Sequence, residues 1–120
     1  MVRSIIAVVD DLFFAAKIRG TAEQLGITVS FPRSIGTLVE IARRDRPSLI
    51  MCDLHSQKID PIALAKILKS DEEFHQIPLL GFFSHVQTEL QSEAEQAGFD
   101  RVIPRSAFAK FLPQILAGTE

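Results

Sequence analysis

Residues 49–54, Leu-Ile-Met-Cys-Asp-Leu, are the stretch that decides the fold. An apolar run that leads directly into an aspartate, without alternation of apolar and polar side chains, is typical of a strand buried on both faces. Residues 5–11, Ile-Ile-Ala-Val-Val-Asp-Asp, show the same pattern near the N-terminus. Strands of this kind need helices above and below them, so the sequence predicts a parallel sheet covered on both faces.

Outward from these two segments, short apolar runs alternate with longer segments of helical period, which predicts an α/β fold with five strands. The expected strands are residues 4–9, 27–31, 48–52, 77–82 and 101–103. The expected helices are residues 13–25, 35–44, a segment that begins at Pro61, 86–97 and 106–116. Pro113 lies inside the last of these helices, where a proline removes a backbone donor.

Length and composition narrow the possible functions. The 120 residues, 47% of them hydrophobic, suit one domain spanning 1–120 with a core that needs no disulfide or structural metal. A net charge of −2 argues against binding to nucleic acid or to a membrane surface. A single cysteine, Cys52, and the lack of any apolar run near the ~20 residues of a membrane helix predict a cytoplasmic protein. Cys52 itself is expected to be buried and inert.

Polar side chains follow the expected strands at the edge where ligands bind in open parallel sheets. Asp10 and Asp11 follow the first strand, Asp53 the third, Ser84 the fourth and Arg105 the fifth. Two carboxylates 4 Å apart repel by roughly 4 kcal/mol at an effective dielectric constant near 20, so three of them need a cation or a proton. Mg²⁺, which prefers oxygen ligands, meets this need. The alternative is that these acids only cap helices.

Five motifs, in this order and spacing, carry a resemblance to a known family: residues 5–11, residues 49–54, Ile59-Asp60, Pro78–Ser84 and Gly98–Asp100. Over essentially its whole length the chain resembles the receiver domain of bacterial two-component response regulators. The resemblance implies a doubly wound, flavodoxin-like fold whose five parallel strands lie in the order 2-1-3-4-5. It also implies that an aspartate accepts a phosphoryl group from a histidine kinase or a phosphotransfer protein.

The resemblance assigns roles to individual residues. Asp53 would be the phosphoacceptor, and Asp10 and Asp11 would hold Mg²⁺ together with it. The backbone carbonyl of His55 would be a further ligand of the metal. Ser84 stands where the family has a serine or threonine that binds a phosphoryl oxygen.

The chain also departs from the family pattern. Arg105 replaces the lysine expected after the fifth strand; it keeps the charge, but its planar donors are aimed differently. An alternative register that aligns the prolines would put Ile103 in that place, whereas counting without a gap from the preceding glycine favours Arg105. Val102 replaces an aromatic switch residue. Gln57 stands where many receivers have proline, and Pro61 where they often have glycine.

Two functions remain open from the sequence. The first is a signalling module, not an enzyme, that takes a phosphoryl group on Asp53 and switches the face formed by the fourth helix, fifth strand and last helix. That face would contact a downstream protein or a second copy of the chain. The second is a pseudo-receiver that binds or dimerises regardless of phosphate. An aspartyl phosphatase is disfavoured because residue 55 is His, and a flavin-binding domain because Asp10 and Asp11 would repel its phosphate.

The sequence also predicts which of several aromatic and apolar side chains are buried. Each adjacent phenylalanine pair, 13–14 and 82–83, is expected to place at least one ring away from the core, and an outward Phe13 could contact a partner. Leu25 and Phe111 are expected on the buried stripes of the first and last helices. His85 is expected to be an ordinary exposed residue.

Overall fold

The computed structural model describes residues 3–84 and 87–119. In this part of the chain five parallel strands form one sheet with the order β2-β1-β3-β4-β5. Their bounds are β1 Ser4–Val8, β2 Thr28–Ser30, β3 Leu49–Asp53, β4 Leu79–Phe83 and β5 Arg101–Pro104. The expected number of strands and the order 2-1-3-4-5 are therefore confirmed, with each strand shifted by no more than two residues at either end.

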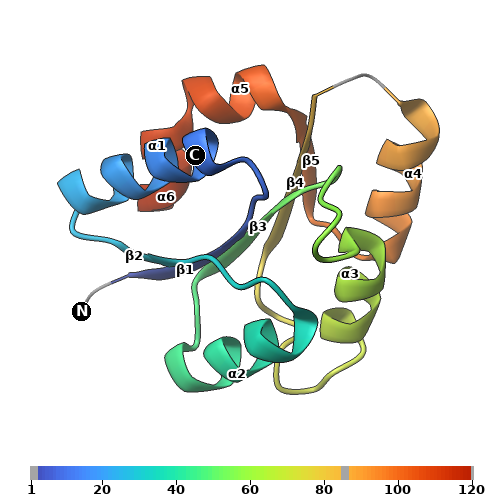
Figure 1. Ribbon diagram of the computed structural model, residues 1–120. Helices are drawn as coiled ribbons and strands as arrows, with labels where there is room; N and C mark the ends of the chain where they lie inside the picture. The colour runs from blue at the N-terminus through green and yellow to red at the C-terminus, as the bar shows by residue number, and fades with distance from the viewer. Residues whose placement is uncertain (1–2, 85–86, 120) are drawn as a thin grey trace.

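Helices cover both faces of this sheet, as the continuous apolar strands require. Figure 1 shows α1, α5 and α6 on one face and α2, α3 and α4 on the other. Their bounds are α1 Leu12–Gln24, α2 Ile35–Asp45, α3 Pro61–Lys69, α4 Thr88–Ala97, α5 Arg105–Lys110 and α6 Leu112–Ala117. Within residues 3–84 and 87–119, no helix has the length and apolar content needed to cross a bilayer.

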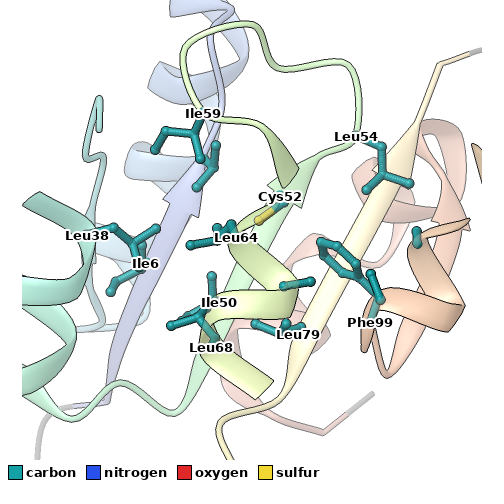
Figure 2. Packing of buried hydrophobic residues seen from close by; sticks show 14 of the residues in the cluster. Ile6, Leu38, Ile50, Cys52, Leu54, Ile59, Leu64, Leu68, Leu79 and Phe99 are labelled. Carbon is teal, nitrogen blue, oxygen red and sulfur yellow. The ribbon is translucent and has the colours of Figure 1, made fainter. Parts of the chain in front are cut away.

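The central strand β3 contributes to the cores on both faces. Ile50 and Cys52 point to the face covered by α2, α3 and α4, where they pack with Leu38, Leu64 and other apolar side chains (Figure 2). Met51, one residue away, points to the opposite core. All five residues of β3 are buried, which is why this strand shows no polar alternation.

The core beneath α1, α5 and α6 is built around three phenylalanine rings. Phe82 and Phe108 stack with their centroids 4.3 Å apart, and Phe14 meets Phe82 edge-on at 5.7 Å. Phe83 is also buried, on the other face of the sheet. The expectation that residues 82–83 place one ring outside is therefore wrong, because adjacent strand residues face opposite sides and both sides are covered. Phe13, by contrast, is 90% exposed.

The single C-terminal helix expected over residues 106–116 is divided into α5 and α6. Pro113 lies in the first turn of α6, where its missing N–H is not needed, and Phe111 separates the two helices. Phe111 is 37% exposed and Leu25, at the C-terminal cap of α1, is 43% exposed. Both expectations of burial were wrong because these residues stand at helix ends, off the apolar stripe. His85 and the expected start of α4 at residue 86 lie outside the described residues.

A lysine ties the end of α3 to the starts of β4 and β5. Lys69 Nζ donates to the carbonyl oxygens of His75 and Ile77 and to Asp100 Oδ2, each at 3.1 Å. Its aliphatic stem runs past Gly98, which has a φ of +124° and lies so close that a Cβ atom would overlap Lys69 Cγ. Glycine at position 98 is therefore required by both its backbone conformation and its neighbour.

We expect Gly98→Ala to lower the free energy of unfolding by about 1–3 kcal/mol, because alanine is strained at this φ and displaces Lys69. Gly20→Ala in α1 is the matched control, since nothing lies within 4 Å of the added Cβ. The control should be neutral or stabilising by up to about 1 kcal/mol. Urea unfolding followed by circular dichroism measures both, and equal effects would contradict the explanation.

Candidate functional site

The acidic edge of the sheet is built by two neighbouring strands. β1 and β3 pair in parallel, with Val8 beside Cys52, so Asp53 at the end of β3 lies at the level reached by the chain just after β1. Asp10 and Asp11 follow there. On the other side of β3, Ser84 and Arg105 come directly after the paired residues Phe83 and Pro104. The sheet thus brings every predicted site position to one end of the molecule.

Asp53 is the last residue of β3, and its side chain is held by the turn that follows the strand. Its side chain is 9% exposed, and Oδ1 accepts a hydrogen bond from the backbone N–H of His55 at 2.9 Å. Among the described residues no donor reaches Oδ2. Asp53 therefore presents one carboxylate oxygen that is not committed to a protein contact, at the end of the central strand.

Asp10 is bound on both oxygens by the loop between β3 and α3. Ser56 Oγ donates to Oδ1 at 2.8 Å, and the backbone N–H of Gln57 donates to Oδ2 at 2.8 Å. Burial acts to raise the pKa of the Asp10 carboxyl, but the hydrogen bonds from Gln57 and Ser56, with smaller contributions from the backbone and charge of Lys58, outweigh it and hold this pKa below its ordinary value. The loop thus stabilises Asp10 as a carboxylate.

Asp11 has a different set of partners. Its Oδ1 caps α1 by accepting from the N–H groups of Phe13 at 2.9 Å and Phe14 at 3.1 Å. Its Oδ2 accepts from Arg105 Nη2 at 3.2 Å. The hydrogen bonds from Phe14 and Arg105 lower the pKa of the Asp11 carboxyl. The alternative interpretation, that acids at strand ends cap helices, therefore holds for Asp11.

Arg105 reaches the acidic edge from the first turn of α5. Besides its ion pair with Asp11, its guanidinium carbon lies 4.0 Å from the centroid of the Phe14 ring, a cation–π contact. Of the two sequence alignments considered for the cation, only the one that uses residue 105 gives a positive charge beside Asp11. Ile103 lies within β5 and carries no charge.

The three carboxylates do not form a metal-binding group in this arrangement. Within residues 3–84 and 87–119, no three side chains of His, Cys, Asp or Glu lie where they could hold one ion together. Asp10 faces the loop after β3, and Asp11 faces α1 and Arg105. The side chains have the right chemistry for a hard cation, but their positions are set by protein donors. The expected metal ligation by Asp10, Asp11, Asp53 and the His55 carbonyl stays a prediction.

The remaining site residues occupy peripheral positions. Ser84 is exposed, one residue beyond β4. Val102 is half-buried against the core beneath α4, so the position of the family's aromatic switch residue is filled by packing. Ser56 was not among the site residues expected from the sequence. The residue type at position 57 was the signal available in the sequence, because any residue other than proline supplies the N–H that Asp10 accepts.

Beside Asp10 the surface is hollowed and positively charged. Arg19, Arg33 and Lys58 line, together with Asp10, a hollow of about 180 Å³. These cations come from α1 and from the loops after β2 and β3. Their charges favour the approach of an anionic group to this side of the site.

Cys52, the neighbour of Asp53, is fully buried on β3, as expected. Burial, with a smaller contribution from the charge of Asp53, raises the pKa of its thiol far above the ordinary value. The thiol therefore has neither the ionised form nor the access that a nucleophile or redox group needs.

We expect Cys52 to resist Ellman's reagent in the native protein in mildly alkaline buffer, and to react fully in urea. Because the chain has one cysteine, the absorbance reports this thiol alone. Native labelling as fast as that of a free thiol would contradict the burial. Slow native labelling that accelerates with denaturant would report the opening of β3.

Comparison with known proteins agrees with the architecture. No protein-family model matches the chain. The polar-differentiation response regulator DivK of Brucella ovis is 25% identical over 105 residues, which cover 88% of this chain and 85% of the relative. The phosphorylated cyanobacterial phytochrome response regulator RcpA superposes with a TM-score of 0.80 at 21% identity, over 98% of this chain and 91% of that chain.

A second solved structure extends the comparison. The receiver domain of the sensor histidine kinase PA1611 from Pseudomonas aeruginosa, which has a magnesium ion coordinated in its active-site cleft, superposes with a TM-score of 0.77 at 19% identity. The superposition covers 98% of this chain and 99% of that one. The chain therefore has the fold of response-regulator receiver domains, and its sequence is distantly similar to the response regulator DivK.

Proposed function

We propose that this chain is a phosphorelay receiver in which Asp53 accepts a phosphoryl group from a phosphohistidine of a kinase or phosphotransfer protein. The observation that supports it is the state of Asp53: a carboxylate at the end of the central strand, with Oδ1 fixed by His55 N–H and Oδ2 without a donor among the described residues. Such a domain is a signalling module that is itself modified, not an enzyme that turns over a separate substrate.

The transfer uses groups at this edge. Oδ2 of Asp53 attacks the phosphorus, the bond from phosphorus to the donor nitrogen breaks, and the electron pair stays on the leaving imidazole. The phosphoryl oxygens then carry charge close to Arg105, whose guanidinium provides planar donors. Ser84, one residue beyond β4, would supply a hydroxyl donor to the same group. The cations beside Asp10 help to attract the anionic donor.

We also propose that Mg²⁺ binds at this edge through Asp10, Asp11, Asp53 and the His55 carbonyl. These residues would hold the ion, and a divalent cation bound there would neutralise charge on the transferring group. The magnesium ion in the PA1611 receiver domain supports this assignment. In the structure Asp10 and Asp11 accept hydrogen bonds from Ser56 and Arg105, and a cation would compete with these donors for the carboxylates.

The output would pass through the face formed by α4, β5 and α5. Val102 on this face has no ring to swing between a buried and an exposed position, so the switch would not depend on a rotating aromatic side chain. We propose that a downstream protein or a second copy of the chain binds this face. Residues 1–120 would act as one receiver unit in the cytoplasm, without direct contact with nucleic acid or membrane.

A second candidate function is supported by the charge compensation at the site. Ser56, Gln57 and Arg105 already satisfy Asp10 and Asp11 without a cation. A pseudo-receiver that binds partners regardless of phosphate would need no more than this. Phosphorylation of Asp53 separates the two functions.

The first test is intact-mass spectrometry after incubation with acetyl phosphate and Mg²⁺. We expect the native chain to gain one phosphoryl group and Asp53→Asn to gain none. Asp45→Asn, which alters a half-buried aspartate paired with Arg44 at the end of α2, is the matched control and should label like the native chain. If no adduct forms where an ordinary receiver is labelled, the phosphorelay proposal fails and the pseudo-receiver remains.

The second test concerns the cation. We expect Arg105→Ala to slow labelling of Asp53 by about tenfold or more, because a charge-assisted donor to the phosphoryl group is worth about 1.5–3 kcal/mol. Lys110→Ala removes another cation of α5, one that lies over Phe111 away from the acidic edge, and should leave the rate unchanged. Equal rates in the native chain and Arg105→Ala would exclude Arg105 from the transfer.

A further inference from the structure

The loop that follows β3 closes onto Asp10. We call Ser56 Oγ and the backbone N–H of Gln57, which donate to the two oxygens of Asp10 at 2.8 Å each, the Asp10 clamp. Ser56 is 9% exposed, so its hydroxyl is largely removed from solvent. Both members come from adjacent positions, and together they occupy the carboxylate that the proposed function assigns to a metal ion.

One half of the clamp depends on the residue type at position 57. The donor is a backbone N–H, and proline, which many receivers carry at this position, has none. Any other residue at position 57 would keep the donor. The clamp is therefore set by the absence of proline and not by the glutamine side chain.

The clamp is linked to the core beneath α2 and α3. Ser56 Oγ also accepts from the N–H of Ile59 at 3.4 Å. Ile59 is 2% exposed and packs in the cluster that contains Leu38 and Leu64 (Figure 2). A change in the partner of Ser56 therefore affects Ile59, which lies two residues before α3 begins at Pro61.

We propose that the Asp10 clamp competes with divalent cations, so that a metal ion binds at the acidic edge only when Ser56 and Gln57 release Asp10. Hydrogen bonds to a charged group are strong, and a cation that needs the same carboxylate must replace them. Metal affinity is then reduced by the equilibrium between clamped and released loop. Ser56 and Gln57 act as positioning residues for Asp10. The inference rests on the metal assignment of the proposed function, but metal binding is measured without phosphoryl transfer.

Isothermal titration of the whole chain with Mn²⁺, repeated with Mg²⁺, tests the clamp. We expect Gln57→Pro and Ser56→Ala to bind the ion more tightly than the native chain, by about tenfold or more, since each removes one charge-assisted bond to Asp10. Gln57→Ala is the matched control: it removes the side chain, keeps the N–H, and should bind like the native chain. In NMR spectra of the native chain, added Mg²⁺ should also change the chemical shift of the Gln57 backbone amide, because its hydrogen bond to Asp10 is lost.

The results separate this inference from the function on which it rests. Equal affinities in all four proteins, or no binding in any of them, would overturn the clamp. If Gln57→Pro does not fold by circular dichroism, Ser56→Ala against Gln57→Ala decides the question. If Gln57→Pro and Ser56→Ala bind the ion more tightly but no phosphoryl adduct forms on Asp53, the clamp is supported and only the phosphorelay proposal is contradicted.

Discussion

The chain must compensate three carboxylates that the topology places at one edge. Because β1 and β3 are parallel neighbours and both lead into aspartates, Asp10, Asp11 and Asp53 reach the same end of the sheet whatever the loops do. Negative charges gathered at one edge of the sheet repel one another. Each carboxylate has its own donors. The loop after β3 donates to Asp10, the N-terminus of α1 and the Arg105 guanidinium donate to Asp11, and a single backbone N–H donates to Asp53. Of the three, Asp53 has the fewest partners, and this asymmetry distinguishes it chemically.

Much of the fold could be predicted because apolar runs identify strands buried on both faces. Where prediction failed, the cause was local. Pro113 divided the last helix, and Leu25 and Phe111 stood at helix ends, where periodicity no longer determines burial. Phe83 was misjudged because two adjacent rings were expected to point one inward and one outward, whereas a sheet covered on both faces buries both of them.

The site could be predicted only as a set of positions. Strand ends located Asp10, Asp11, Asp53 and Arg105, since that depends on topology alone. The pairing of each carboxylate depends on loop conformation, which periodicity does not encode. At Gln57 it is the backbone N–H, and not the side chain, that contacts Asp10. A sequence does not reveal such a backbone donor, except where another residue replaces an expected proline, which has no N–H.

The contact between Arg105 and Phe14 has a consequence for sequence variation. Phe14 presents one ring to the guanidinium at 4.0 Å and contacts Phe82 and Phe108 at 5.7 Å each, so its shape serves the surface and the interior together. An aliphatic residue of similar volume fills the interior but offers the cation no π face. Among descendants of this chain, positions 14 and 105 should therefore covary: an arginine accompanied by an aromatic ring, and a lysine, which stacks less well, free of that constraint.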